Sequence, residues 1–149
     1  MTQSSASHGA NLRKGRVSEQ GRVYLVTLVV RDRRPVFQDF AMGRLLVREL
    51  RAADAEGLTT TWTFVVMPDH CHWLLALESR SLSSLVGRVK ARCAKAAGQG
   101  PLWQPGFHDH AARQEEDLQA MARYMVANPL RAGVITRVGD YPLWDAAWL

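Results

Sequence analysis

A chain of 149 residues with 47% apolar content is long enough for one domain with a buried core. No apolar run is long enough to span a bilayer, and the first 20 residues lack the apolar block of a secretory signal, so we expect no membrane association. A net charge of +5 favours polyanionic partners, although an ordinary solvated surface explains it equally well. Two cysteines, Cys71 and Cys93, make no disulfide framework or zinc cluster, which points to a reducing cytoplasm.

The pattern of apolar residues predicts the order strand, helix, two strands, helix, strand, helix. These elements are expected at residues 23–30, 39–55, 59–66, 70–77, 82–96, 102–113 and 115–127, and the strand at 102–113 is expected to bend at Pro105-Gly106. Gly57 is expected to end the first helix, Ser81 to cap the second, and Met67-Pro68-Asp69 to form the turn of a hairpin. Each helix has one apolar stripe. The sequence therefore predicts a small α+β domain, with helices packed on one face of an antiparallel sheet.

The domain is expected to occupy residues 21–149. Residues 1–20 are polar and basic, with Arg13, Lys14 and Arg16 among them. They are expected to form a flexible segment ahead of the domain.

Two closely spaced histidine pairs are candidates for metal binding. His70 and His72 lie in a predicted strand, where alternate side chains share a face, so both imidazoles point to one side and Cys71 to the other. Two neutral imidazoles at this spacing can share a divalent metal. Hydrogen bonding in a half-buried setting would also explain them. His108 and His110 have the same spacing in a less regular segment, so spacing alone does not choose between the pairs.

Tyr124 is a candidate nucleophile on the last predicted helix. It lies off the apolar stripe, and Asn128 follows four residues later, on the same face if the helix continues that far. A half-buried core tyrosine with a satisfied hydroxyl is the simpler alternative. Tyr24, in the first strand, and Tyr141, before Pro142, have no comparable polar helical neighbour.

Three segments carry a resemblance to a known family. Residues 67–75, MPDHCHWLL, resemble the His-hydrophobic-His signature of single-tyrosine HUH transposases, the insertion-sequence 200-like superfamily. Residues 103–110, WQPGFHDH, followed by Arg113, and residues 122–134, ARYMVANPLRAGV, resemble the branch associated with repetitive extragenic palindromes (REP). The similarity extends from about Gly21 to Trp144, and the order and spacing of the motifs together are specific.

The resemblance implies a role for each matching residue. His70 and His72 would be ligands of Mg²⁺ or Mn²⁺, and Tyr124 the nucleophile. Asn128 would be a third ligand, because the family places an amide side chain one turn after its tyrosine. A ferredoxin-like (RRM-like) sheet with the histidines on a central strand is implied as well. Cys71 departs from the pattern, since the family prefers a larger aliphatic residue there.

The implied activity is that of a metal-dependent single-stranded DNA endonuclease and strand transferase, which acts at DNA hairpins through a 5′-phosphotyrosine intermediate. Exposed basic side chains would hold the DNA phosphates. For those on predicted helices, an ordinary solvated helix face is an equally good explanation. The candidate DNA-binding residues are Arg88, Arg92 and Lys95 on one helix, Arg44, Arg48 and Arg51 on another, and His110 and Arg131. Within the superfamily, the chain could act as a monomer or a homodimer.

Two other functions fit parts of the sequence. A catalytically silent, domesticated relative would bind hairpin DNA or RNA without cutting it. A small metal-binding or structural protein unrelated to nucleic acid is the third possibility. Tyr124→Phe distinguishes the enzyme from the silent binder, and the salt dependence of hairpin affinity distinguishes both from the third class.

Overall fold

The computed structural model describes residues 21–98, 100–112, 115–127 and 144–146. Its elements are β1 (Val23–Val29), η1 (Arg31–Arg33), η2 (Val36–Gln38), α2 (Phe40–Ala55), β2 (Thr59–Met67), β3 (His70–Leu77), α3 (Leu82–Ala97), β4 (His108–Ala111), α4 (Glu115–Val126) and β5 (Trp144–Ala146). The predicted α+β class and the predicted order of the longer elements are confirmed. The expected flexible segment 1–20 lies outside the described residues. None of the described helices has both the length and the apolar character needed to cross a bilayer.

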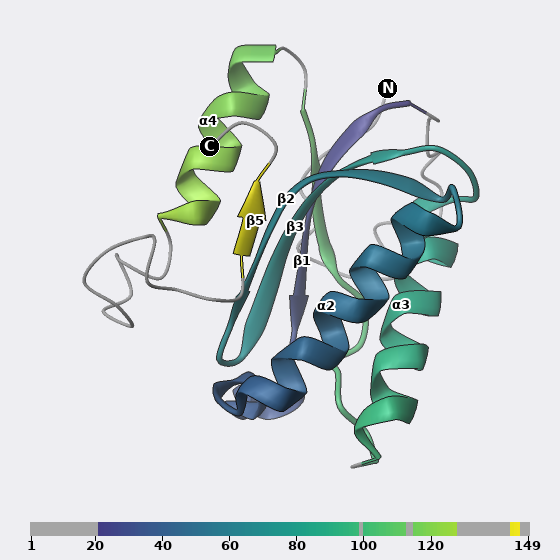
Figure 1. The fold of residues 1–149 in the computed structure, drawn as a ribbon, viewed down its shortest axis with the longest axis vertical. Helices are drawn as coiled ribbons and strands as arrows, with labels where there is room; N and C mark the ends of the chain where they lie inside the picture. The colour runs from purple at the N-terminus through teal and green to yellow at the C-terminus, as the bar shows by residue number, and fades with distance from the viewer. Residues whose placement is uncertain (1–20, 99, 113–114, 128–143, 147–149) are drawn as a thin grey trace.

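Five strands form one sheet in the order β4-β1-β3-β2-β5, and every neighbouring pair is antiparallel (Figure 1). β3 is the central strand because it pairs with β1 on one side and β2 on the other. The predicted turn between β2 and β3 is confirmed but is one residue shorter than expected: Met67 belongs to β2 and pairs with His70, so Pro68 and Asp69 alone connect the strands. The sequence analysis did not predict β5, which adds three residues beside β2.

α2 and α3 pack side by side on one face of the sheet (Figure 1). Local signals set their ends: the Asp39 carboxylate accepts the backbone N–H of Ala41 at 2.9 Å, and the Ser81 hydroxyl accepts that of Ser84 at 3.1 Å. Gly57, with φ +76°, follows α2 as predicted. The apolar stripes of both helices cover the alternate residues of β1 and β3 that are fully buried, such as Leu28.

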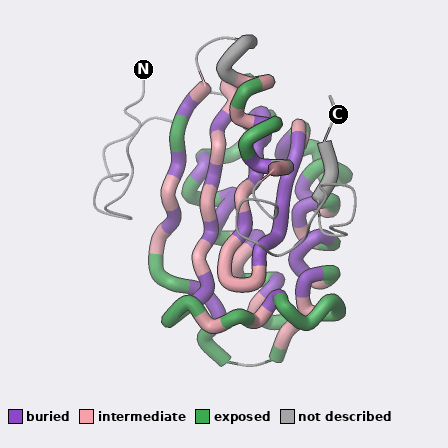
Figure 2. The backbone as a smooth tube through the Cα atoms, turned by 90° about the vertical axis from the view of Figure 1, so that its left-hand side faces the viewer, coloured by how far each residue is buried: buried purple, intermediate pink, exposed green. Residues whose placement is uncertain are grey.

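α4 lies against the opposite face of the sheet, where it contacts β2, β3 and β5 (Figures 1 and 2). Ala122 and Met125 are its fully buried residues. They account for the burial of this second face, where Val65 and Leu74 are 0% exposed although they point away from α2 and α3. The expectation that helices pack on one face therefore holds for α2 and α3, and α4 adds a second layer. α4 leaves the β1–β4 part of this face less covered, with half-buried residues alternating along β1.

The strand predicted at 102–113 is shorter than expected. Only β4 belongs to the sheet, and Trp103 forms no more than an isolated bridge to the end of β1. The chain bends at Pro105-Gly106, where the sequence predicted a bend and where Gly106 has φ +75°. Lys90 of α3 holds this bend, because its ammonium donates to the carbonyl oxygens of Gln104 at 2.9 Å and Gly106 at 2.7 Å. Those carbonyls are thus satisfied without a neighbouring strand. The Trp103 indole N–H donates to the Lys90 carbonyl at 3.2 Å, so three hydrogen bonds join Lys90 to residues 103–106.

A polar network ties the end of α2 to an irregularity in β2, where the register shifts between Thr61 and Thr63. The Asp54 carboxylate accepts the hydroxyls of Thr59 at 2.5 Å and Thr61 at 2.8 Å, as well as the Thr61 backbone N–H at 3.2 Å. Thr61 in turn accepts the indole N–H of the fully buried Trp73 at 2.9 Å. One carboxylate therefore orients three donors at the irregularity.

Asp54→Ala is expected to lower the free energy of unfolding by about 1–2 kcal/mol, because it leaves hydrogen-bond donors unsatisfied next to a buried strand. Urea denaturation followed by tryptophan fluorescence would measure the loss. Asp39→Ala, which removes a carboxylate from the other end of α2, is the comparison and should cost about 1 kcal/mol. An Asp54 variant as stable as wild type would show that the network adds nothing.

Candidate functional site

The first histidine pair lies on the central strand, as the resemblance implied. His70 and His72 point to the face that carries α4, whereas Cys71 points to the face covered by α2 and α3. The two imidazole rings are 4.9 Å apart between centroids and meet edge to face at 77°. Both residues are half-buried. They are therefore close enough to act on one ion, and neither is enclosed in the core.

Each imidazole is oriented by a hydrogen bond at Nδ1. His70 Nδ1 lies 2.7 Å from a carboxylate oxygen of Asp69, and His72 Nδ1 lies 2.9 Å from the hydroxyl of Thr27 on β1. An ionised carboxylate can only accept, so this contact favours a proton on Nδ1, which in the neutral ring leaves the lone pair on Nε2. Metal-binding histidines commonly have this arrangement, in which the second nitrogen donates to an outer partner.

Sequence analysis did not identify either partner. Thr27 is 45 residues away from His72 and meets it only through the pairing of β1 with β3. Asp69 precedes His70 directly in the chain, so an acid beside a histidine in a two-residue turn was a usable signal. Arg33 adds a third group, with its guanidinium 3.6 Å from the other carboxylate oxygen of Asp69.

Tyr124 lies in the C-terminal half of α4, the helix that packs on the histidine-bearing face (Figure 1). Its side chain is 56% exposed, one of the two large exposed hydrophobic residues of the described chain. Tyr24, by contrast, is 1% exposed in the core beneath α2 and α3. Of these two tyrosines, only Tyr124 lies at the protein surface.

The third ligand that the resemblance implied remains a prediction. Asn128 lies outside the described residues, as does Arg131. Within the described part of the chain, no three His, Cys, Asp or Glu side chains gather closely enough to hold a metal by themselves. The two histidines therefore need a ligand of another kind, such as an amide oxygen, water or a phosphate oxygen.

The second histidine pair lies on the same face of the sheet as the first. Thr27 pairs with His72 on one side and with His108 on the other, so the three residues form one row across β3, β1 and β4. Strands lie about 4.8 Å apart, which separates the two histidine backbones by about 10 Å. His108 and His72 are therefore too far apart to complete one compact site. His110, farther along β4, is exposed.

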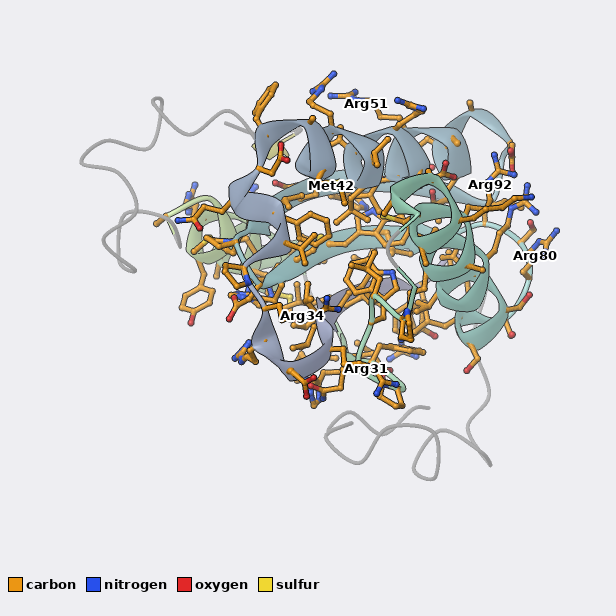
Figure 3. The ribbon with its side chains drawn as sticks, turned by 90° about the horizontal axis from the view of Figure 1, so that it is seen from below. Arg31, Arg34, Met42, Arg51, Arg80 and Arg92 are labelled. Carbon is orange, nitrogen blue, oxygen red and sulfur yellow. The ribbon has the colours of Figure 1, made fainter. Side chains whose placement is uncertain are left out.

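The helical arginines lie on the other side of the sheet from the histidines. Arg88 and Arg92 of α3 donate to Glu56 and Glu49 respectively, each at 2.7 Å, and the bond to Glu49 raises the pKa of Arg92 further. Figure 3 shows Arg92 at the outer side of α3. Two of the three α3 residues proposed to hold DNA thus already have carboxylate partners. Lys95 is exposed on the same helix.

The α2 arginines have aromatic partners. Arg44 lies over the ring of Phe40 at 5.9 Å, and Arg51 over that of Phe64 at 5.8 Å. Arg48 is exposed between them, and Figure 3 shows Arg51 on the outer side of α2. A strand held at the histidines would have to pass around a sheet edge to reach this group, so a contact there stays a prediction.

Both thiols are enclosed in the core. Burial, followed by the nearby Cys93 sulfur, raises the pKa of Cys71 far above its ordinary value, and burial with the charge of Glu49 raises that of Cys93 to about 12. The Cys71 thiol donates to the carbonyl of His72 at 3.7 Å, away from the imidazoles. Cys71 is therefore a packing residue and no candidate metal ligand.

These shifts predict a loss of stability in alkaline solution. The unfolded thiols lose protons above their ordinary pKa of 9.0, whereas the folded ones keep them. Stability is thus fully present below pH 9 and falls as the pH rises toward 12, by at most about 1.4 kcal/mol per pH unit and thiol. Denaturation at pH 8 and pH 10 would measure the drop. The double variant Cys71→Val/Cys93→Ala should lose less stability between these two pH values than wild type. An equal loss in the variant would show that the thiols are not its cause.

The comparisons with known proteins agree with the motifs. No family model matches the chain. A REP-associated tyrosine transposase of Escherichia coli (strain K12) is 33% identical over 81 residues, which cover 53% of this chain and 49% of that protein. This match spans about half of the relative's length. A Haemophilus influenzae protein (strain ATCC 51907 / DSM 11121 / KW20 / Rd), provisionally named as the same kind of transposase, is 24% identical over 144 residues, covering 83% of this chain and 78% of that protein.

A solved structure gives the same result for the fold. The structure of a REP-associated tyrosine transposase bound to a REP hairpin superposes with a TM-score of 0.77 at 26% identity. The superposition covers 87% of this chain and 79% of that chain. The sequence and fold comparisons therefore support the REP-associated tyrosine transposase branch that the motifs predicted.

Proposed function

We propose that this protein is a metal-dependent nuclease and strand transferase for single-stranded DNA, which acts beside DNA hairpins through a covalent bond to Tyr124. The observation that carries the proposal is the pair of oriented imidazoles on the same side of the sheet as the helix with the exposed tyrosine. A relative of the same fold was solved in complex with a REP hairpin, which supports a hairpin substrate.

The residues present fit a divalent cation. Nδ1 of His70 donates to Asp69, so Nε2 has the lone pair that a metal requires, and the Thr27 hydroxyl can hold His72 in the same tautomer. Asn128 is the proposed third ligand. A bound Mg²⁺ or Mn²⁺ would supply Lewis-acid stabilisation of the negative charge that builds up on the scissile phosphate.

Tyr124 would carry the covalent step. Its phenolic oxygen forms a bond to phosphorus as the bond from phosphorus to the 3′ oxygen breaks, so the phenolic proton is lost and a 3′-hydroxyl is released. The product is a 5′-phosphotyrosine, in which the phosphodiester bond energy is retained. A 3′-hydroxyl from a second strand can reverse the step, which joins strands without a nucleotide cofactor.

The sheet face beside α4 offers a place for the single strand. His72 and His108 lie in one row across this face, and His110 is exposed farther along β4. Imidazole rings can donate to phosphate oxygens and stack on bases. We therefore place the flank of the hairpin along β4 and β1, with the scissile phosphate at His70 and His72.

The direct test incubates the protein and Mn²⁺ with end-labelled single-stranded hairpins taken from its own genomic surroundings. Denaturing gels should show a protein–DNA adduct and a shortened strand, and both should disappear when a chelator is added. Hairpin binding without an adduct, across several hairpins and metals, would instead indicate the silent binding relative. Affinity that stays flat as salt rises would exclude both, because phosphate contacts require a salt dependence.

A further inference from the structure

The carboxylate of Asp69 stands behind the first proposed ligand. Its Oδ1 lies 2.7 Å from Nδ1 of His70, and its Oδ2 lies 3.6 Å from the guanidinium of Arg33. The three groups form a chain of cation, carboxylate and imidazole at the end of the central strand. Asp69 is partly buried, with 30% of its side chain exposed, so solvent screens these contacts only in part.

The backbone around Asp69 is held from outside its own turn. The carbonyl of Asp69 accepts the N–H of Val30, and that of Pro68 accepts the N–H of Phe37, both at 2.9 Å. The turn is thus fastened to the segment that connects β1 with α2. These two bonds fix the position of the Asp69 main chain beside His70.

Arg33 occupies an unusual backbone conformation. Asp32 and Arg33 have φ values of +58° and +52°, in the left-handed region that side chains other than glycine rarely adopt. Such conformations are energetically unfavourable and persist where the surroundings impose them. The chain follows this path where it brings Arg33 to Asp69.

The two histidines are held by unequal partners. His70 has an anionic acceptor, whereas His72 has the neutral hydroxyl of Thr27 at 2.9 Å. A carboxylate acceptor increases the basicity of the opposite ring nitrogen more than a hydroxyl does, and it fixes one tautomer. The hydroxyl of Thr27 can donate or accept and leaves the tautomer of His72 open.

We propose that Asp69 is a positioning residue, which locks His70 in the Nδ1–H tautomer and makes it the stronger donor of the pair, with Arg33 holding the carboxylate in place. Its effect on metal affinity rests on the proposed function, whereas its effect on the tautomer does not. Asp69 acts through His70 and is no third ligand, since its oxygen contacts Nδ1 and Nε2 lies on the opposite side of the ring.

Asp69→Ala and Asp69→Asn separate the two contributions. Alanine removes both the acceptor and the charge, whereas asparagine keeps an acceptor oxygen and removes the charge alone. Asp32→Asn is the matched control. It removes the same negative charge as Asp69→Asn, but from an exposed side chain next to Arg33. Asparagine tolerates the positive φ of this position. Thermal unfolding would verify that all three variants fold.

The first measurement is the tautomer of His70 in metal-free protein, read from the ¹⁵N chemical shifts of its ring at about pH 8, where free imidazole is neutral. Wild type and Asp32→Asn should show the Nδ1–H form, and Asp69→Ala should lose it. A His70 tautomer unchanged in Asp69→Ala would overturn the proposal. This result stands whether or not the protein cleaves DNA.

The second measurement is Mn²⁺ affinity by calorimetry, in the absence of DNA. Asp69→Ala should bind Mn²⁺ about 10–100-fold more weakly than wild type, with Asp69→Asn between them and Asp32→Asn unchanged. Equal weakening by Asp32→Asn would overturn the proposal, because long-range charge would then explain the effect. If wild type bound no metal, the proposed function would fail and the tautomer would still decide the role of Asp69.

Discussion

Tyr124→Phe is expected to abolish the covalent protein–DNA adduct and to lower strand cleavage by more than about 10³-fold, while hairpin affinity changes little. The substitution deletes only the hydroxyl that would attack phosphorus. Because the side chain is 56% exposed, the loss of a hydroxyl there leaves the core intact. Denaturing gels of labelled hairpins would measure the adduct and the cleavage, and a gel-shift titration would measure affinity.

Tyr24→Phe is the matched control, since it makes the same chemical change at a tyrosine that is 1% exposed in the core. It should reduce stability by about 1 kcal/mol through the lost hydrogen-bonding group and leave adduct formation intact. An adduct that persists in the Tyr124 variant would rule out this residue as the nucleophile. Tyr141, which lies outside the described residues, would then be the next one to replace.

His72→Ala is expected to weaken Mn²⁺ binding by more than about 100-fold and to abolish cleavage at ordinary metal concentrations, because one imidazole cannot replace the pair. The side chain is half-buried beside Thr27, so the fold should survive its removal. Calorimetry of metal binding and cleavage assays over a range of Mn²⁺ concentrations would test both effects. Partial recovery of cleavage at high Mn²⁺ would fit a weakened site.

His108→Ala tests the other histidine pair under the same conditions. His108 occupies the same row of the sheet as His72, with Thr27 between them, so the two variants differ mainly in which pair they remove. We expect metal affinity to be unchanged and hairpin binding to weaken modestly. The opposite result, with metal binding lost only in the His108 variant, would transfer the metal site to β4.

Much of the fold could be predicted because the signals are local. Asp39 and Ser81 cap their helices, Gly57 ends one of them, and Pro68-Asp69 makes the hairpin turn, each through contacts within a few residues. Strand alternation placed His70 and His72 on one face and Cys71 on the other, again from neighbouring positions alone. The resemblance to the transposase family followed from short motifs in a specific order.

The errors arose where distant residues compete for backbone groups. The apolar pattern of 102–113 favoured a strand with a bend at Pro105-Gly106; the bend is present, but only β4 beyond it belongs to the sheet, and the Lys90 ammonium takes up the carbonyls of Gln104 and Gly106. No window around residue 105 contains that lysine. β5 was missed for a similar reason, since three residues join the sheet only because β2 is available to pair with them.

The sequence by itself therefore indicated the longer helices and strands, the face of each strand residue, and the resemblance that names the proposed catalytic groups. The tertiary structure decided which groups act together. Thr27 reaches His72 only through strand pairing, and the path between β1 and α2 brings Arg33 to Asp69. It also separated the α2 and α3 arginines from the histidines by the thickness of a sheet. Such contacts depend on register and layer order, which are set by the packing of the whole core and which no local pattern encodes.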